Sequence, residues 1–281
     1  MIDNHFTIRI ANREEVNIAI EWAVKEGWNP GIHDADYYYL AAPNGFLIGF
    51  LGNEPIATIF AIKYGDSFGF MDFYIVKPAY RGKGYGTQIW NAGLKYLEGR
   101  NIGLDGVVAL QENYNKYGFK RAYRNRRYEG SSGDHPPENA EIIKLSSLPF
   151  ETVDLYDRPF FPANRASFIK SWINQPKSTA LGIMRDGKLV GYGVIRTCRS
   201  GSEIAPLFAD SPALSESLFL ALSSEVKSTC PIYLDTPEVN QAAVSLAERY
   251  NMKVVFETAR MYTGKEPDIP LHRLFGVIPF G

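Results

Sequence analysis

The chain has 281 residues, a length that favours two domains of ordinary size over one compact core. Hydrophobic residues make up 45% of it and charged residues 22%, as in soluble globular proteins, and the formal net charge is -1. This balance provides no global field to attract nucleic acid or an anionic membrane, so neither partner is expected.

Cysteine and histidine usage predicts neither a disulfide framework nor a metal site. The two cysteines, Cys198 and Cys230, stand in no metal-type or redox-type spacing, which suits a reducing compartment. The four histidines are scattered, without the close pair typical of a zinc site. The N-terminus has no secretion pattern, and no apolar run approaches the length of a membrane span. We therefore expect a cytoplasmic protein that binds no metal.

The chain begins with a short strand and two helical segments. Residues 7–10 alternate as a strand, and Asn12 can cap a helix that continues to Val24. A turn at 27–31 stops this helix, and residues 34–40 predict a helical turn with several aromatic side chains. Three strands joined by hairpin turns follow, at 46–51, 56–64 and 68–76.

A basic, glycine-rich turn comes directly after the third of these strands. Residues 81–86 read R-G-K-G-Y-G, and a helix is expected over 84–98. Glycines let successive backbone N–H groups converge on one point, and the helix N-terminus adds partial positive charge there. Arg81 and Lys83 add full charges. The turn therefore predicts a site for a phosphate or pyrophosphate.

Other interpretations of this turn compete with that one. A P-loop requires G-x-x-x-x-G-K-[ST], which is absent here. A dinucleotide fingerprint requires G-x-G-x-x-G tight against a buried strand, whereas this spacing is G-x-G-x-G and Pro78 and Arg81 intervene. Asp105 does lie near where a ribose-binding acid would fall, so this interpretation stays open. A glycine-rich surface turn with incidental charges stays open as well.

The turn and its surroundings resemble the acetyl-CoA loop of the GNAT superfamily of N-acetyltransferases. The family signature is R/Q-x-x-G-x-G/A after a strand ending in V-x-P, and residues 76–78 (V-K-P) and 81–86 match it. The order of elements up to this point is also the GNAT order. After a strand expected at 105–109, residues 113–119 look like the family's Y-x-K-x-G-F segment. These matches imply an acetyl-CoA-dependent N-acetyltransferase.

The second half of the chain looks like a second copy of the same fold. Residues 129–140 lack periodicity and are rich in turn formers, so they are expected to link a first domain (1–128) to a second (141–281). The stretch after Leu207 contains no glycine, arginine or lysine, so this copy cannot hold a pyrophosphate in the same way. We expect an α/β (α+β) fold of two tandem GNAT-type domains, the second degenerate. Each would be a mixed, mostly antiparallel twisted sheet flanked by helices.

The resemblance also assigns residues to the cofactor. The pantetheine arm of coenzyme A would pair with backbone groups at the end of the strand 68–76, and the glycine turn would hold the pyrophosphate. The implied cofactor-binding residues are Tyr74, Ile75, Val76, Arg81, Gly82, Lys83, Gly84, Tyr85, Gly86 and Thr87.

Two residues are expected to move protons. A phenol has a reference pKa of about 10, and the resemblance makes Tyr114 the general acid that protonates the departing thiolate. Where many family members have a glutamate, this chain has Phe70. Asp72, two residues on, faces the same way in a regular strand and is the candidate base, whereas a bulge would swing it away. A packing role for Tyr114 and a hydrogen-bonding role for Asp72 stay open.

The acceptor-binding residues are expected in the segment that usually forms one wall of a GNAT acceptor cleft. Trp28, Asp34, Asp36, Tyr37 and Tyr38 lie there, and Trp28, Asp36 and Tyr38 are the expected substrate-binding residues. Acids would suit a cationic amine, although a solvated helical turn has the same composition. The second domain, which contains an aromatic and charged segment at 157–165, is expected to close over the first domain and help select the acceptor.

The expected function is transfer of an acetyl group to a primary amine of a small molecule or peptide, by direct attack on the thioester. The alternative is a non-catalytic coenzyme A-binding sensor or scaffold, which loss of the usual glutamate favours. Transfer of a longer acyl chain also stays open, and so do the acceptor and the oligomeric state.

Overall fold

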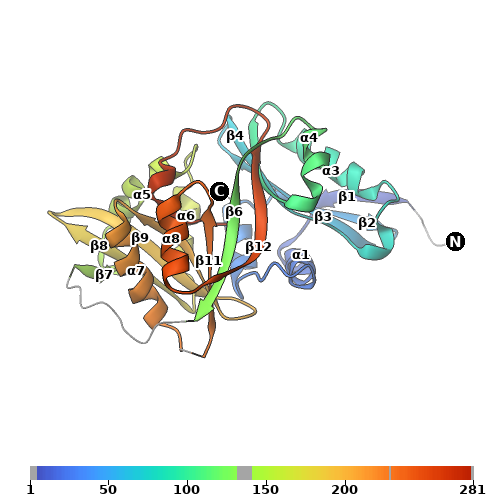
Figure 1. Ribbon diagram of the computed structural model, residues 1–281. Coiled ribbons are helices and arrows are strands. Elements are labelled where there is room, and N and C mark those ends of the chain that lie inside the picture. The colour runs from blue at the N-terminus through green and yellow to red at the C-terminus, as the bar shows by residue number, and fades with distance from the viewer. Residues whose placement is uncertain (1–4, 132–140, 228, 280–281) are drawn as a thin grey trace.

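The computed structural model describes residues 5–131, 141–227 and 229–279 (Figure 1). The strands are β1 (Phe6–Ile10), β2 (Phe46–Leu51), β3 (Glu54–Tyr64), β4 (Phe68–Val76), β5 (Asn101–Val107), β6 (Lys120–Ser131), β7 (Ile142–Lys144), β8 (Ser178–Arg185), β9 (Lys188–Thr197), β10 (Ser202–Ala209), β11 (Pro231–Pro237), β12 (Lys253–Tyr262) and β13 (Leu274–Gly276). The α-helices are α1 (Arg13–Lys25), α2 (Asp34–Ala41), α3 (Tyr85–Tyr96), α4 (Gln111–Asn115), α5 (Phe150–Asp157), α6 (Ala166–Trp172), α7 (Pro212–Ser224) and α8 (Gln241–Arg249).

The expected fold class is confirmed. All described strands belong to one mixed sheet, in the order β1-β2-β3-β4-β5-β12-β6-β11-β10-β9-β8-β7, with β13 paired to β10. Within the described residues, only β4 with β5 and β10 with β11 run parallel. Asn12 caps α1 as expected, in a capping box with Glu15. β5 begins before the expected position, because Gly103 interrupts the apolar pattern; a Cβ there would lie 3.0 Å from the Phe70 ring.

The two halves exchange their last strands. β6, the last strand of the first half, pairs with β11 of the second, and β12 pairs with β5 of the first. β6 and β12 also pair with each other, and Figure 1 shows them as adjacent green and red ribbons across the middle of the molecule. Each half of the sheet is therefore completed by a strand from the other half.

The exchange also changes the start of the expected linker. Residues 129–131 belong to β6, because their backbone pairs with β11 and, at Glu129, with β12 as well. The expectation that they are linker is therefore wrong, while 132–140 lie outside the described residues. The domain boundaries at 128 and 141 stay a prediction.

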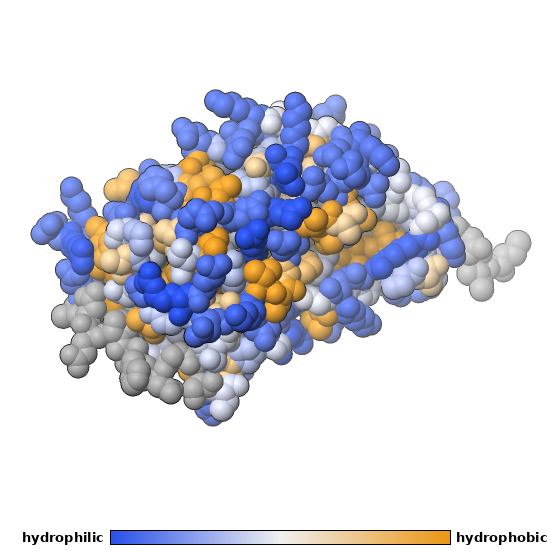
Figure 2. Space-filling model, in the orientation of Figure 1, coloured by the Kyte–Doolittle hydropathy of each residue, from blue (hydrophilic) through white to orange (hydrophobic). Residues whose placement is uncertain are grey.

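Three apolar cores hold helices against the sheet. One lies beneath α3 and one beneath α7 and α8, on the first and second halves respectively. The third is shared, and in it Tyr38 of α2 stacks on Trp172 of α6 with 5.9 Å between ring centroids. Figure 2 shows that the face in view is mostly hydrophilic, with separate apolar patches. No helix in the described part of the chain has both the length and the apolar character to cross a membrane.

Each half contains a pair of parallel strands that part from each other. β4 and β5 pair only up to Met71 and Leu104, and β10 and β11 only up to Ile204 and Leu234. In the second half, β13 pairs with β10 beyond the point where β10 and β11 separate. The Val277 N–H also donates to the Asp235 carbonyl at 2.8 Å. The chain itself thus fills the second gap, whereas the first gap opens into a cavity.

Candidate active site

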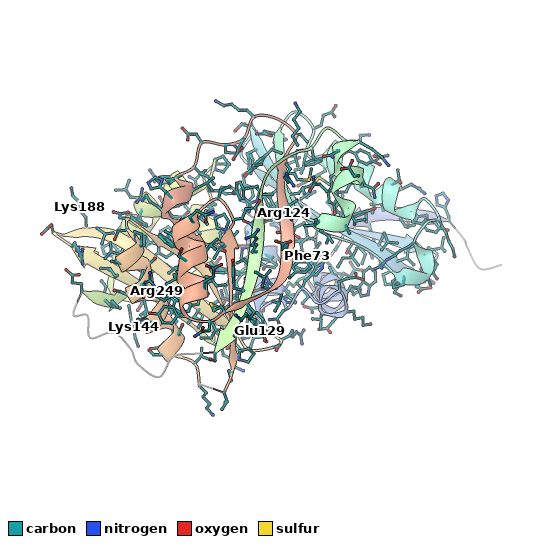
Figure 3. All side chains as sticks on the ribbon, viewed as in Figure 1. Phe73, Arg124, Glu129, Lys144, Lys188 and Arg249 are labelled. Carbon is teal, nitrogen blue, oxygen red and sulfur yellow. The ribbon has the colours of Figure 1, made fainter. Side chains whose placement is uncertain are left out.

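A β-bulge distorts β4 just beyond its last pair with β5. The register with β3 shifts between Phe60 opposite Asp72 and Thr58 opposite Ile75, which leaves one extra residue in β4. Phe73 takes up the distortion with φ of 47°, and Thr58 Oγ1 donates to its carbonyl at 3.1 Å. Figure 3 labels Phe73 near the middle of the molecule. The bulge ends the ladder on the β5 side and leaves backbone groups of β4 available there.

A cavity of about 650 Å³, which we call the large cavity, lies where β4 and β5 part. Of the residues expected to bind the cofactor, eight line it: Tyr74, Ile75, Val76, Arg81, Gly82, Gly84, Gly86 and Thr87. Lys83 and Tyr85 do not line it. The Lys83 ammonium lies 5.5 Å from the centre of the Tyr80 ring, and the Tyr85 ring packs on Phe6.

The N-terminus of α3 opens into the large cavity without a side-chain cap. Gly84 is the N-cap, with φ of 84°, and makes no capping hydrogen bond, so the first N–H groups of the helix are available to a ligand. Gly86 lies against β4, where a Cβ would come 2.4 Å from the Tyr74 hydroxyl. An anion fits this arrangement, because free N–H groups and the helix dipole point to one place.

Arg81 is held at the edge of the same cavity. Its Nε donates to the Val76 carbonyl at 2.8 Å, and its Nη2 forms an ion pair with Glu26 at 2.5 Å. Both Arg81 and Glu26 line the cavity. A bound anion would therefore compete with Glu26 for the guanidinium.

Tyr114 of α4 lines the large cavity opposite β4. Its ring is buried, stacks on Trp90 at 5.4 Å, and lies so close to Gly106 that a Cβ there would be 2.3 Å from it. Burial raises the pKa of Tyr114 above its ordinary value, with smaller effects of the same sign from Tyr74 and Asp72. The phenol is therefore fully protonated at neutral pH and can donate a proton.

Asp72 stands just before the bulge and lines the large cavity as well as a smaller one. The bulge has not removed it from the site, and the Phe73 N–H donates to its Oδ1 at 2.7 Å. Burial raises the pKa of Asp72 to about 7, the Phe73 N–H opposes the shift, and the charge of Asp105 adds to it. A carboxyl with this pKa can exchange protons at neutral pH.

The small cavity, of about 120 Å³, adjoins the large one. Both are lined by Trp28, Asp72, Phe73, Asp105 and Val107. Of the expected acceptor residues, Trp28 and Tyr38 line the small cavity. The geometry brings a carboxyl, a phenol and two adjoining cavities together.

Other residues expected near the acceptor lie elsewhere. Asp36 lines neither cavity and pairs with Arg13 on the exposed side of α2. Residues 157–165 also line neither cavity, because Asp157 and Arg165 form a buried ion pair at 2.8 Å. The expectation that the second domain closes over the first and helps select the acceptor stays a prediction.

Side chains from four strands form a buried charge network at the small cavity. Arg196 of β9 donates from Nε to Asp34 Oδ1 of α2 at 3.0 Å and lies 3.2 Å from Glu203 of β10. Arg127 of β6 lies 3.4 Å from Glu203 and pairs with Asp235 of β11 at 2.7 Å. Of these residues, only Asp34 was expected near the acceptor. Arg127, Arg196, Glu203 and Asp235 were not expected at the site, because they are far apart in the chain and share no motif.

The network also holds the wall of the cavity. Arg127 Nη1 donates to the Trp28 carbonyl at 2.6 Å, and the Gly31 N–H donates to Asp34 at 2.7 Å. The second half also holds this loop, because Arg196 pairs with Asp34 and the Ser200 N–H donates to Asn29 Oδ1 at 2.8 Å. Within the described residues, no three His, Cys, Asp or Glu side chains are grouped so that they could hold a metal ion.

Comparison with known families and proteins agrees with this architecture. The model of the GNAT acetyltransferase family matches residues 13–119, and a GNAT acetyltransferase domain model matches residues 153–276. The chain therefore belongs to the GNAT superfamily of acyltransferases, and it contains two GNAT domains in tandem.

Individual relatives match over most of their length. The holothin acyltransferase of Pseudoalteromonas sp. (strain SANK 73390) is 27% identical over 269 residues, which cover 96% of this chain and 92% of that protein. A candidate acetyltransferase of Pyrococcus horikoshii has a similar solved structure, with a TM-score of 0.83, 22% identity and coverage of 98% and 95%. A tandem GNAT protein from the clavulanic acid biosynthesis pathway has a TM-score of 0.66 and 13% identity, with coverage of 94% and 100%.

Proposed function

We propose that the protein is an N-acetyltransferase that uses acetyl-CoA and acetylates a primary amine. The observation that carries this proposal is the placement of Tyr114 and Asp72 on one cavity that also contains the uncapped N-terminus of α3. The relative named as holothin acyltransferase supports acyl transfer as the reaction. A cytoplasmic location, expected from the sequence, is part of the proposal.

Coenzyme A fits the large cavity by the chemistry of its walls. The α3 N-terminus with Gly82, Gly84 and Arg81 would hold the pyrophosphate, and the free edge of β4 at 74–76 would pair with the pantetheine amides. When bound, acetyl-CoA supplies the acetyl group as a thioester.

Two residues of the chain then take part in proton transfer, one as an acceptor and one as a donor. Asp72, as the carboxylate, accepts a proton from the attacking amine, directly or through water, as the C–N bond forms. Tyr114 donates its hydroxyl proton to the sulfur as the C–S bond breaks, so the products are an amide and a free thiol. Asp72 lies at the junction of the two cavities, which suits a base that works between acceptor and thioester.

Release of free thiol from acetyl-CoA with a panel of small amines, amino acids, polyamines and peptides tests the proposal. We expect Tyr114→Phe to lower kcat by roughly 10²-fold or more, the range for loss of a general acid, with little change in acetyl-CoA binding. Tyr96→Phe is the matched control, since Tyr96 lines neither cavity and its ring, which carries a cation–π contact with Lys63, is retained.

Two results would contradict the proposal. If Tyr114→Phe and the unchanged protein turned over equally fast, Tyr114 would be excluded as the general acid. Tight coenzyme A binding without thiol release for any amine would favour the non-catalytic sensor instead.

A further inference from the structure

The small cavity contains a hydrogen-bond acceptor that no protein group satisfies. Asn125 of β6 lines this cavity and is only 4% exposed. Its Nδ2 donates to Asp105 Oδ1 at 2.9 Å, which fixes the orientation of the amide, since an oxygen there would face a carboxylate. Its Oδ1 is buried and has no hydrogen-bond partner among the described residues. A buried acceptor without a partner is costly, so a donor on a ligand would be bound there favourably.

The charges of the small cavity favour a cationic guest. Asp34, Asp105 and Asp235 each pair with an arginine, and Glu203 lies between Arg127 and Arg196. Asp72 forms no ion pair with an arginine or lysine within the described residues, and the Phe73 backbone N–H donates a hydrogen bond to it. It is therefore the carboxyl that can interact with an incoming ammonium or its proton.

The size and walls of the small cavity limit the guest. Its volume of about 120 Å³ is less than a fifth of the 650 Å³ of the large cavity. Its walls come from both halves of the chain: Trp28 and Phe73 from the first, Phe256 and Ile278 from the second. A short, compact molecule can be enclosed here, whereas a peptide would have to leave most of its chain outside.

We propose that the small cavity binds the acceptor as a compact monoamine, and that Asn125 is a specificity-determining residue whose Oδ1 accepts a hydrogen bond from the amine N–H. This inference rests on the proposed acetyl transfer. The strand exchange is what brings Asn125 here, because β6 lies between β12 and β11. The second half contributes Arg196, Glu203 and Asp235 to the charge network, and its Phe256 and Ile278 help to enclose the amine.

The first test is a binding measurement that needs no turnover. The full chain, saturated with coenzyme A, is titrated with ethylamine, cyclopentylamine and benzylamine, and the side-chain amide signals of Asn125 are followed by ¹⁵N NMR. We expect saturable shifts with at least one compact monoamine, and weaker or no shifts with spermidine or a lysine-containing pentapeptide. Absence of saturable shifts with every monoamine, or a preference for the peptide, would overturn the inference.

The second test uses kinetics with the best monoamine of that panel. Asn125→Leu, which keeps the branched shape and the number of side-chain heavy atoms, is expected to raise KM for the amine on the order of 10-fold, while coenzyme A binding stays the same. Thr236→Val is the matched control, since Thr236 of the adjacent strand is buried with an unpartnered hydroxyl but lines neither cavity. An unchanged KM in Asn125→Leu would refute the role of Asn125 while leaving acetyl transfer intact. Failure of the unchanged protein to release thiol would refute the proposed function, and the NMR shifts would still report on the amine site.

Discussion

At the scale of single residues, the bulge and the burial of Asp72 suit its proposed role as the base. The loss of the family's usual glutamate at Phe70 left the identity of the base open in the sequence. The structure places the Asp72 carboxyl at the junction of both cavities, next to a backbone N–H and near Asp105. Its pKa, raised to about 7, matches the working pH of a general base more closely than an ordinary aspartate would.

Asp72→Asn tests this role through the pH profile. The base must be ionised, so kcat/KM of the unchanged protein should rise with pH through about 7. The variant should lose that rise and be slower by roughly 10²-fold or more above pH 8. Steady-state kinetics between pH 5.5 and 9 would show both effects, and a variant that keeps the rise would exclude Asp72 as the base.

Thermal unfolding of the same variant provides an independent check with a defined sign. The pKa of Asp72 is higher in the folded chain than its ordinary value of 3.8, so the folded state binds its proton more tightly. The unchanged protein therefore loses stability from this group as pH rises from about 4 to about 7, and asparagine does not titrate. The difference in Tm between variant and unchanged protein should shift in favour of the variant across that range. A constant difference would mean that the carboxyl is not perturbed.

The two acids of α2 show what the sequence of a short helix leaves undecided. The sequence offers both Asp34 and Asp36 near the acceptor, with Asp36 as the expected substrate-binding residue. In the structure Asp34 is the buried acid at the small cavity, and Asp36 pairs with Arg13. Aromatic residues occupy both sides of this short helix, so its sequence defines no buried face. Asp34 is held at the cavity by a hydrogen bond from Arg196, which lies 162 residues away in the chain.

At the scale of elements, the glycine loop and the start of α3 act as a unit. Gly82 and Gly84 both have positive φ, which turns the backbone so that the uncapped helix N-terminus opens into the large cavity. In the second half the matching helix, α7, begins with Ser211 as its N-cap, whose side chain accepts from the Leu214 N–H, followed by a proline. One helix start is thus available to a ligand, while the other is already capped.

Gly84→Ala and Gly99→Ala separate the role of the loop from the cost of strain. Both glycines have φ above 80° and open space where a Cβ would point, so each alanine should cost about 1–2 kcal/mol of folding free energy. Only Gly84 lines the large cavity. We expect KM for acetyl-CoA to rise on the order of 10-fold in Gly84→Ala alone, because a side chain alters the backbone that receives the anion. Steady-state kinetics with acetyl-CoA and chemical denaturation would measure the two quantities, and equal effects on KM would contradict the assignment.

At the scale of the whole molecule, the exchanged strands make the halves depend on each other. β12 lies between β5 and β6, and the shared core joins α2 to α6 through Tyr38 and Trp172. Removing either half would leave unpaired strand edges and an exposed apolar face on the other.

Truncation after residue 140 tests this dependence. The fragment lacks β12, so we expect it to aggregate or to unfold without a cooperative transition. As a control, a protease site inserted between residues 131 and 141 of the full chain would cut the backbone and leave both fragments present. The cut protein should keep its cooperative transition, because the exchanged strands hold the fragments together. A truncated fragment with a Tm near that of the full chain would contradict the structural role of the exchange.

The sequence by itself determined the family, the position of the glycine loop and the assignment of Tyr114 as the candidate acid. These features are local, because a loop, a helix start and a short motif each lie within a few consecutive residues. Two tandem domains, with the second lacking the loop, could be inferred for the same reason. Only the tertiary structure decided which strand completes each half, that β13 fills the second gap, and that Asn125, Arg127, Arg196 and Glu203 meet beside Asp72. Pairing between distant strands depends on long-range packing, and a single sequence carries no local pattern for it.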